Sequence, residues 1–277
     1  MDMIEQCPGR GMVSFVGAGP GDPELLTIKG REAIAAAALV LYAGSLVPEA
    51  LLDYATPWAR KVNSAPLTLE ECHALMRETA LAGKAVARLH TGDASLYGAL
   101  REQVALLDRD GIPWRVIPGI TAACAAAAAA GITFTVPEVT QTLVITRMPG
   151  RTPMPAGERL RALASHGTSL AVYLSSQLVE EMQTELLQSL PPETPVICAY
   201  RVGWPQQRIH RTTLSEVSRC VRENNLHRQT VFLILPGLNA SSAPSRLYDA
   251  GFSHGWREAS ESVPPHDASE GVQPIKE

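Results

Sequence analysis

The sequence lacks the usual features of disulfide-stabilised and metal-binding proteins. Its five cysteines are scattered, and none forms a CxxC or CxxxC pair. An odd, unpaired set argues against a disulfide framework and against structural zinc, so we expect free thiols in a reducing compartment. The seven histidines form no HExxH motif and no acidic-histidine ligand spacing, so we predict no metal. A GxSxG nucleophile motif is also missing, and we propose no covalent nucleophile.

Long apolar runs and an excess of positive charge are missing too. No run of 18 apolar residues occurs, and residues 1–11 lack the apolar core of a signal peptide. The formal net charge is −4, whereas nucleic-acid binding calls for a clustered positive surface. We therefore expect a cytoplasmic protein that binds neither membrane nor nucleic acid.

What the sequence does have is a regular alternation of apolar strand-like and alanine-rich helix-like segments. In the first half this alternation predicts a parallel, doubly wound sheet. The expected strands there are 12–16, 39–42, 85–89 and 114–117, and the expected helices are 24–38, 69–82, 97–108 and 122–130.

The second half repeats the alternation after a Gly/Pro-containing stretch at 131–138, which we interpret as a linker. Its expected strands are 141–146, 169–174, 195–200, 207–212 and 230–235, and its expected helices are 158–164, 178–190 and 214–223. The fold class is therefore α/β with two α/β domains, 11–137 and 138–240. A tail at 241–277, rich in Ser, Pro and Gly, is expected to be partly disordered.

Three glycine-containing turns follow expected strands, beginning at Gly17, Thr91 and Pro118. Ligands of parallel α/β sheets bind beyond the carboxyl ends of the strands, so these turns predict a binding edge. Each turn also has a structural interpretation, which stays open here. The first is a stiff turn that is not GxGxxG, Asp93 or Ser95 suits a helix cap, and Thr121 suits an N-cap.

Basic residues are dominated by arginine, with only four lysines among 24. Biased genomic composition is one explanation. Converging arginines that bind a polycarboxylate ligand through charge-assisted pairs are another. Arg147 and Arg151 lie on a loop after an expected strand, and Arg201, Arg208 and Arg211 follow later in the same half.

Together these motifs resemble the tetrapyrrole (corrin/porphyrin) methyltransferase family over roughly residues 11–256. The resemblance is carried by VGAGPGDPELLT at 16–27, HTGDASLYG at 90–98 and PGITA at 118–122. Within the family, LYAGSLVP at 41–48, QTLVITRMPGRTPMP at 141–155 and SRLYD at 245–249 are similar to the precorrin-4/cobalt-precorrin-4 C(11)-methyltransferase branch.

The resemblance implies two α/β domains with S-adenosylmethionine in the cleft between them, a tetrapyrrole substrate and a homodimer. Carried over by motif, the residues expected to bind the cofactor are Pro20, Thr91, Gly92, Asp93, Leu96, Thr121, Ala122, Leu174 and Val202. Those expected to bind substrate carboxylates are Arg147, Arg151 and Arg201. No general base can be chosen from the sequence.

Several alternatives remain open from the sequence. The enzyme can instead methylate another position of the corrin, or it can act on uroporphyrinogen III. Family members that methylate uroporphyrinogen III carry an acidic residue just after the strand that here ends at Tyr42, and this chain has Ala43-Gly44 there, which counts against that substrate. An NAD-dependent reductase would need a GxGxxG turn and an acidic residue about 20 positions further on, and both are missing. A non-catalytic binding module would show no turnover. Whether the substrate carries cobalt is undetermined.

Overall fold

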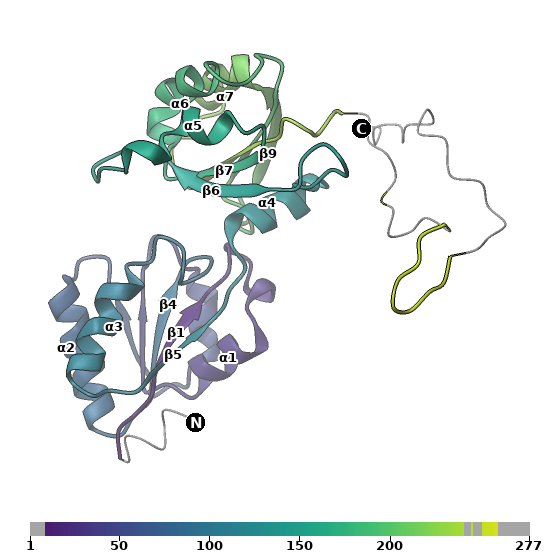
Figure 1. Ribbon diagram of the computed structural model, residues 1–277. Helices are drawn as coiled ribbons and strands as arrows, with labels where there is room; N and C mark the ends of the chain where they lie inside the picture. The colour runs from purple at the N-terminus through teal and green to yellow at the C-terminus, as the bar shows by residue number, and fades with distance from the viewer. Residues whose placement is uncertain (1–8, 241–244, 246–250, 260–277) are drawn as a thin grey trace. The chain divides into compact units, whose positions relative to one another are not determined.

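A computed structural model describes residues 9–240, 245 and 251–259. Contacts divide the chain into two compact units, whose ribbons are shown in Figure 1. One unit comprises 1–125 with 201–207, and the other comprises 126–200 with 208–277. The domain bounds expected from composition, 11–137 and 138–240, remain predictions. Most of the expected tail, including four residues of the SRLYD segment, lies outside the described residues.

The first unit is built on a five-stranded parallel sheet of order β3-β2-β4-β1-β5. Its strands are β1 Val13–Gly17, β2 Leu39–Tyr42, β3 Arg60–Asn63, β4 Val86–His90 and β5 Trp114–Ile117. The predicted parallel sheet is confirmed. β3 was not expected, because its polar sequence RKVN shows no apolar alternation and it pairs with β2 only, at the edge of the sheet.

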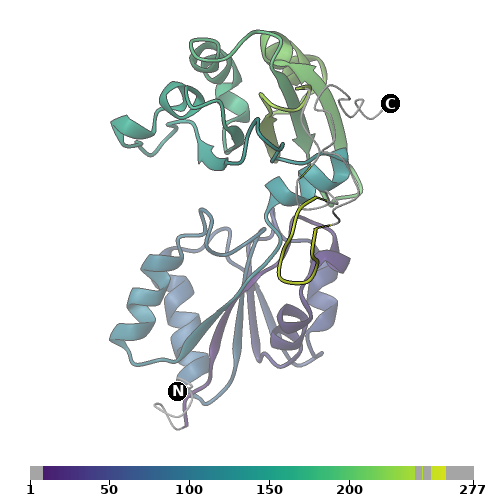
Figure 2. The ribbon, with the colours of Figure 1, turned by 45° about the vertical axis from the view of Figure 1, so that its right-hand side comes forward.

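Helices cover both faces of this sheet, as a doubly wound fold requires. They are α1 Ile28–Ala35, α2 Leu69–Leu81 and α3 Leu100–Arg109, with a 3-10 segment η3 at Glu49–Tyr54. Phe15 of β1 packs in a core with Met76 of α2 and Leu107 of α3. Its neighbour Val16 packs instead with Ile34 of α1, because successive strand residues point to opposite faces. Figures 1 and 2 show α2 and α3 on one face and α1 on the other.

Two helices of this unit begin later than the sequence predicted, for local reasons. The chain first forms a 3-10 turn, η2 Pro23–Leu25, and α1 starts only after Thr27, whose hydroxyl accepts a hydrogen bond from the Gly30 amide at 3.1 Å. α3 starts at Leu100 because Tyr97 and Ala99 have φ angles of +56° and +47°, which an α-helix cannot include.

The second unit contains a mixed five-stranded sheet of order β6-β7-β10-β8-β9. β6 is parallel to β7, whereas β10 is antiparallel to β7 and β8, and β8 is antiparallel to β9. The strands are β6 Leu143–Arg147, β7 Ser169–Tyr173, β8 Pro195–Tyr200, β9 Arg208–Thr213 and β10 Thr230–Ile234. The predicted α/β character of both halves is confirmed.

Three helices cover one face of this mixed sheet (Figure 1): α5 Leu160–Ala164, α6 Val179–Leu186 and α7 Val217–Glu223. Short 3-10 segments precede each of them: η4 Ala156–Glu158, η5 Ser176–Leu178 and η6 Leu214–Glu216. The alanine-rich helix α4 Ala122–Ala130 spans the division between the two units.

Within the described residues, the four cysteines Cys72, Cys124, Cys198 and Cys220 are free thiols. The same part of the chain contains no group of three or more His, Cys, Asp or Glu side chains arranged to hold a metal ion. None of its helices combines the length and the apolar character that crossing a membrane requires.

Candidate functional site

The three glycine-containing turns meet at the carboxyl edge of the first sheet. β4, β1 and β5 are neighbours in that sheet, so the loops that follow them leave from adjacent positions. The loops after β1 and β4 then form a short bridge: the Gly19 amide donates to the Gly92 carbonyl at 3.1 Å, and the Gly92 amide to the Gly19 carbonyl at 2.7 Å. The three turns therefore do lie at one edge of the sheet, and ligand binding at that edge stays a prediction.

Glycine is required in these loops because their backbones touch. A Cβ atom added to Gly119 would lie 2.1 Å from the Gly92 carbonyl oxygen, and one added to Gly17 would lie 2.5 Å from the Gly119 nitrogen. Both distances are far below van der Waals contact, and the opposing atoms are backbone. Gly92 itself has a φ of +64°, a conformation that glycine adopts most readily. We call residues 17–23, 91–98 and 118–121 the glycine cradle.

Asp93 ties two loops of the glycine cradle together. One carboxylate oxygen accepts from the backbone amide and hydroxyl of Ser95, at 2.8 and 2.5 Å, and the other accepts from the Gly119 amide at 2.8 Å. Burial alone would raise the pKa of Asp93, but these hydrogen bonds outweigh it and hold the pKa below its usual value. The N-cap of α3 is Ala99, so Asp93 does not cap that helix.

His90 lies beneath the cradle at the end of β4. Its side chain is buried, and its Nε2 atom has no hydrogen-bond partner among the described residues. Burial lowers the pKa of His90 to about 4, with a further lowering by the nearby charge of Arg88. The imidazole is therefore neutral at physiological pH, and it serves as part of the packing under the loops.

The remaining positions in the cradle or directly next to it that are expected to contact a cofactor differ in accessibility. Thr91 is exposed, and Leu96, Thr121 and Ala122 are half-buried, so their side chains border solvent. Pro20 is buried. The Thr121 carbonyl accepts from the Ala125 amide, as expected of the residue that precedes α4, so its structural interpretation as an N-cap position also stands.

Segment 201–207 joins β8 to β9 but belongs by its contacts to the first unit. It contains Arg201 and Val202, two of the residues singled out from the sequence, and Val202 is buried. It also contains Trp204, which the sequence analysis missed. The signal available was a tryptophan between glycine and proline in the short segment that separates two expected strands.

The other expected site residues lie in the second unit. Leu174 follows β7 with a φ of +53° and a side chain that is 70% exposed, a strained and exposed position of the kind found at functional sites. The Arg147 guanidinium donates to the carbonyl groups of Met148, Thr152 and Pro153 at 3.0–3.2 Å, and so holds its own loop. Arg151, on the same loop, is exposed.

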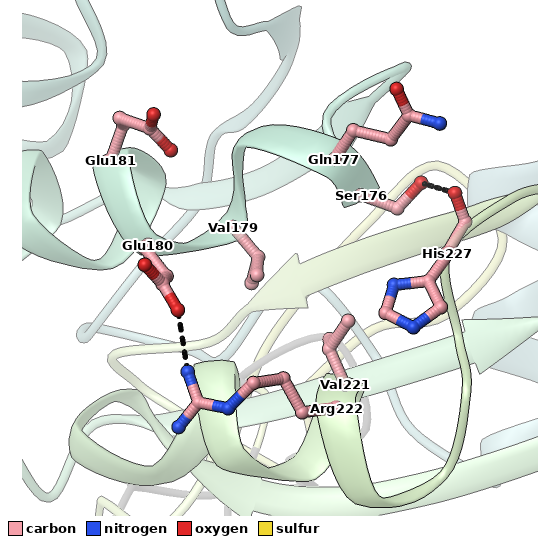
Figure 3. Close-up of a pocket in the computed structure, with 8 residues that line it drawn as sticks. All are labelled: Ser176, Gln177, Val179, Glu180, Glu181, Val221, Arg222 and His227. Carbon is pink, nitrogen blue, oxygen red and sulfur yellow. Dashed lines mark hydrogen bonds and ion pairs between the residues drawn. The ribbon is translucent and has the colours of Figure 1, made fainter.

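A separate hollow of about 420 Å³ in the second unit contains none of the expected site residues (Figure 3). It lies between the start of α6 and the end of α7. Glu180 and Arg222 on its rim form an ion pair at 2.5 Å, and the Ser176 hydroxyl donates to the His227 carbonyl at 2.9 Å. Because these polar groups satisfy one another, we assign no ligand to this hollow.

Comparison with known proteins identifies the family of the chain that carries the glycine cradle. Residues 12–218 match the family model of the tetrapyrrole (corrin/porphyrin) methylases. This chain belongs to that family. The membership predicted from the motifs is confirmed, and it favours a methyltransferase over the reductase alternative.

Two curated relatives are similar over most of the chain. A cobalt-precorrin-4 C(11)-methyltransferase from Methanocaldococcus jannaschii is 43% identical, covering 89% of this chain and 96% of the relative. A precorrin-4 C(11)-methyltransferase from Pseudomonas aeruginosa is also 43% identical, covering 88% and 98%. Identity is the same to both, so it does not separate a cobalt-containing from a cobalt-free substrate.

Solved structures agree with this assignment. A cobalt-precorrin-4 methyltransferase superposes with a TM-score of 0.79 at 40% identity, covering 81% of this chain and 94% of that one. A Thermus thermophilus uroporphyrin-III C-methyltransferase in complex with S-adenosylhomocysteine superposes with a TM-score of 0.67 at 30% identity, covering 81% and 92%.

Proposed function

We propose that this protein transfers a methyl group from S-adenosylmethionine to carbon 11 of precorrin-4 or cobalt-precorrin-4, in cobalamin biosynthesis. The observation that carries the proposal is the glycine cradle: three loops in backbone contact at the carboxyl edge of a parallel sheet, in a chain of the tetrapyrrole methylase family. Precorrin-4 methyltransferases among the relatives at 43% identity support this substrate over uroporphyrinogen III.

The composition of the cradle supports a donor that binds largely to backbone groups. The cradle is rich in glycine and other small residues, so a ligand can lie against its backbone amide and carbonyl groups. We assign donor binding to Pro20, Thr91, Gly92, Asp93, Leu96, Thr121, Ala122, Leu174 and Val202. Use of the cofactor is supported by the S-adenosylhomocysteine complex of the uroporphyrin-III relative.

Bound S-adenosylmethionine supplies a methyl group already activated by its sulfonium. The protein therefore needs to align the substrate carbon with that methyl group and to exclude water, and it needs no strong nucleophile of its own. The rigid cradle suits the alignment, because Asp93 fixes two of its loops by three hydrogen bonds. The cradle thus acts by holding the donor in one orientation.

Arginines of the chain are assigned to the acetate and propionate groups of the substrate. We propose Arg147, Arg151 and Arg201 for this role, since a guanidinium pairs with a carboxylate through two parallel hydrogen bonds. Arg147 makes three bonds to carbonyl groups of residues 148–153, which presents the loop that carries Arg151. One arginine can in this way both order the loop and add positive charge.

Other parts of the sequence interpretation remain predictions. We expect a homodimer in the cytoplasm that requires no metal of its own and binds neither nucleic acid nor membrane. Ultracentrifugation tests the homodimer, cell fractionation tests the compartment, and elemental analysis of the purified protein tests for a bound metal. The pathway, with or without cobalt, is decided by which substrate reacts.

The proposal is tested by a binding experiment followed by a turnover experiment. Calorimetry of the purified protein with S-adenosylhomocysteine is expected to show one site per chain with micromolar affinity or tighter. Turnover with methyl-labelled donor is then expected with precorrin-4 or cobalt-precorrin-4. Binding without turnover on either would contradict the carbon-11 assignment while leaving the donor site intact, and absence of binding would contradict the methyltransferase itself.

A further inference from the structure

Segment 201–207 folds into a compact loop of its own. The Trp204 amide donates to the Arg201 carbonyl at 3.0 Å, the Gln207 amide donates to the Trp204 carbonyl at 2.9 Å, and the Gln207 side chain accepts from the Gly203 amide at 2.8 Å. Arg201 and Gly203 have φ angles of +47° and +79°, so the chain reverses direction sharply there. The loop is thus pre-shaped and presents Trp204 at a fixed place.

Trp204 contacts the first loop of the glycine cradle directly. Its indole Nε1 donates to the Pro20 carbonyl at 3.1 Å. A Cβ atom added to Gly21 would lie 2.3 Å from the indole Cδ1 and 2.4 Å from Nε1, so the ring lies against the Gly21 backbone. A Cβ atom added to Gly203 would lie 2.7 Å from the Asp22 nitrogen, which shows that the two backbones are also in close contact.

This contact explains a feature that the glycine-rich turn alone does not. The atoms nearest to a Cβ added at Gly17 or Gly119 are backbone atoms of the other cradle loops, whereas those nearest to a Cβ added at Gly21 belong to the Trp204 indole. The missing side chain of Gly21 leaves room for the indole. The Arg201 guanidinium lies 5.4 Å from the centroid of the same ring, so the indole is held between backbone and cation contacts rather than free in solvent.

We propose that Trp204 is a positioning residue for the methyl donor. It fixes the loop after β1 through the Pro20 carbonyl and keeps Val202 of its own loop beside that turn, although the indole itself is not assigned to the donor. Pro20 and Val202 are two of the positions to which we assign donor binding, so the inference rests on the proposed function. Trp204 thereby holds the 201–207 loop and the loop after β1, which are far apart in sequence, in one fixed arrangement.

The indole N–H is the feature that phenylalanine cannot replace. Trp204→Phe keeps an aromatic ring against Gly21 but leaves the Pro20 carbonyl without its donor. Losing one neutral hydrogen bond corresponds to about a fivefold loss in equilibrium. We therefore expect the dissociation constant for S-adenosylhomocysteine and the KM for the donor to rise about fivefold. The kcat at saturating donor and the KM for the corrin are expected to stay within about twofold of wild type.

Trp58→Phe is the matched control. Trp58 belongs to the same unit, is 87% exposed, and lies outside the cradle. Its replacement removes an identical chemical group without touching the Pro20 loop, so donor affinity is expected to be unchanged. Thermal unfolding of both variants shows that any loss of affinity belongs to a folded protein.

A double-mutant cycle between Gly21→Ala and Trp204→Ala tests the close contact itself. In the wild-type background the added methyl group collides with the indole, so Gly21→Ala is expected to weaken donor binding at least tenfold. In the Trp204→Ala background the added methyl group has space, so the loss of donor affinity caused by Gly21→Ala is expected to be at least threefold smaller than in the wild-type background. Backbone strain at position 21 is common to both backgrounds and cancels in the cycle.

Calorimetry with S-adenosylhomocysteine alone, without corrin, separates the two proposals. Wild-type protein that binds no S-adenosylhomocysteine would overturn the proposed function and this inference with it. Wild-type protein that binds, with Trp204→Phe binding equally well and additive effects in the cycle, would overturn the inference and leave the proposed function standing. Weaker binding by Trp204→Phe, with kcat preserved and Trp58→Phe unaffected, supports both.

Discussion

Asp93 lies where two loops of the glycine cradle meet, which makes its replacement by asparagine informative. The carboxylate accepts three hydrogen bonds, two from Ser95 and one from the Gly119 amide. Asparagine has nearly the same shape but only one acceptor oxygen. Whichever way its amide is oriented, an NH₂ group faces a backbone N–H of Ser95 or Gly119, and that amide loses its partner.

The cost follows from the bonds that are lost. Hydrogen bonds to a charged group contribute about 1.5–3 kcal/mol each, and Asp93→Asn removes at least one and neutralises the acceptor of the others. We expect the free energy of unfolding of the first unit to fall by about 2 kcal/mol. If the loosened loops must reorder when the donor binds, a comparable loss in binding corresponds to an affinity roughly 30-fold lower.

Calorimetry with S-adenosylhomocysteine and thermal unfolding measure both quantities on one sample. Asp108→Asn is the control, because Asp108 accepts one bond, from the Trp114 indole at 2.6 Å, and an asparagine oxygen can keep it. We expect Asp108→Asn to bind like wild type. Donor affinity of Asp93→Asn within twofold of wild type would refute the view that this carboxylate orders the cradle.

Three further predictions address other parts of the site. Gly119→Ala places a methyl carbon 2.1 Å from the Gly92 carbonyl oxygen and is expected to abolish donor binding in calorimetry. The control Gly150→Ala has open space around the added methyl group and is expected to bind the donor like wild type. Donor binding by both variants would contradict the backbone contact. The pKa of His90 is about 4 when folded and about 6.5 when unfolded, so the unfolded chain takes up the proton first and stability declines as pH falls between these values. Chemical denaturation is expected to show a contribution of about 2 kcal/mol lost between pH 7 and pH 5 that His90→Gln lacks, and an equal pH slope in both proteins would disprove it. Arg147→Lys keeps the charge but loses the planar fork, so the KM for the corrin is expected to rise about tenfold with donor affinity unchanged, and an unchanged KM would leave Arg147 only its loop-holding role.

The arrangement of the first unit could be predicted from sequence because one physical rule governs it. Strands alternating with helices indicate a parallel sheet, and parallel strands end at the same edge, so the turns at Gly17, Thr91 and Pro118 were expected at one edge. That these turns are neighbours there depends on the strand order β4-β1-β5, which only the structure shows. Their contact distances could not be predicted. Only the structure shows that Gly119 is a glycine because of the Gly92 carbonyl, and that Asp93 binds the next loop instead of capping α3.

Other features depended on contacts far apart in sequence. β3 is an edge strand whose polar residues carry no period-two signal, and pairing with β2 alone defines it. The role of Trp204 required knowing that a loop of the second half packs against Gly21, over 180 residues earlier. The start of α3 was misplaced because the positive φ angles of Tyr97 and Ala99 are unusual for these residue types and no local pattern announces them.

The most direct test of the central claim is a turnover assay with methyl-labelled S-adenosylmethionine and enzymatically made precorrin-4 and cobalt-precorrin-4. Mass spectrometry gives the number of methyl groups added, and NMR gives their position. The account predicts one labelled methyl group, on carbon 11, with at least one of the two substrates. A methyl group on another carbon, or no transfer to either substrate by protein that binds S-adenosylhomocysteine, would contradict it.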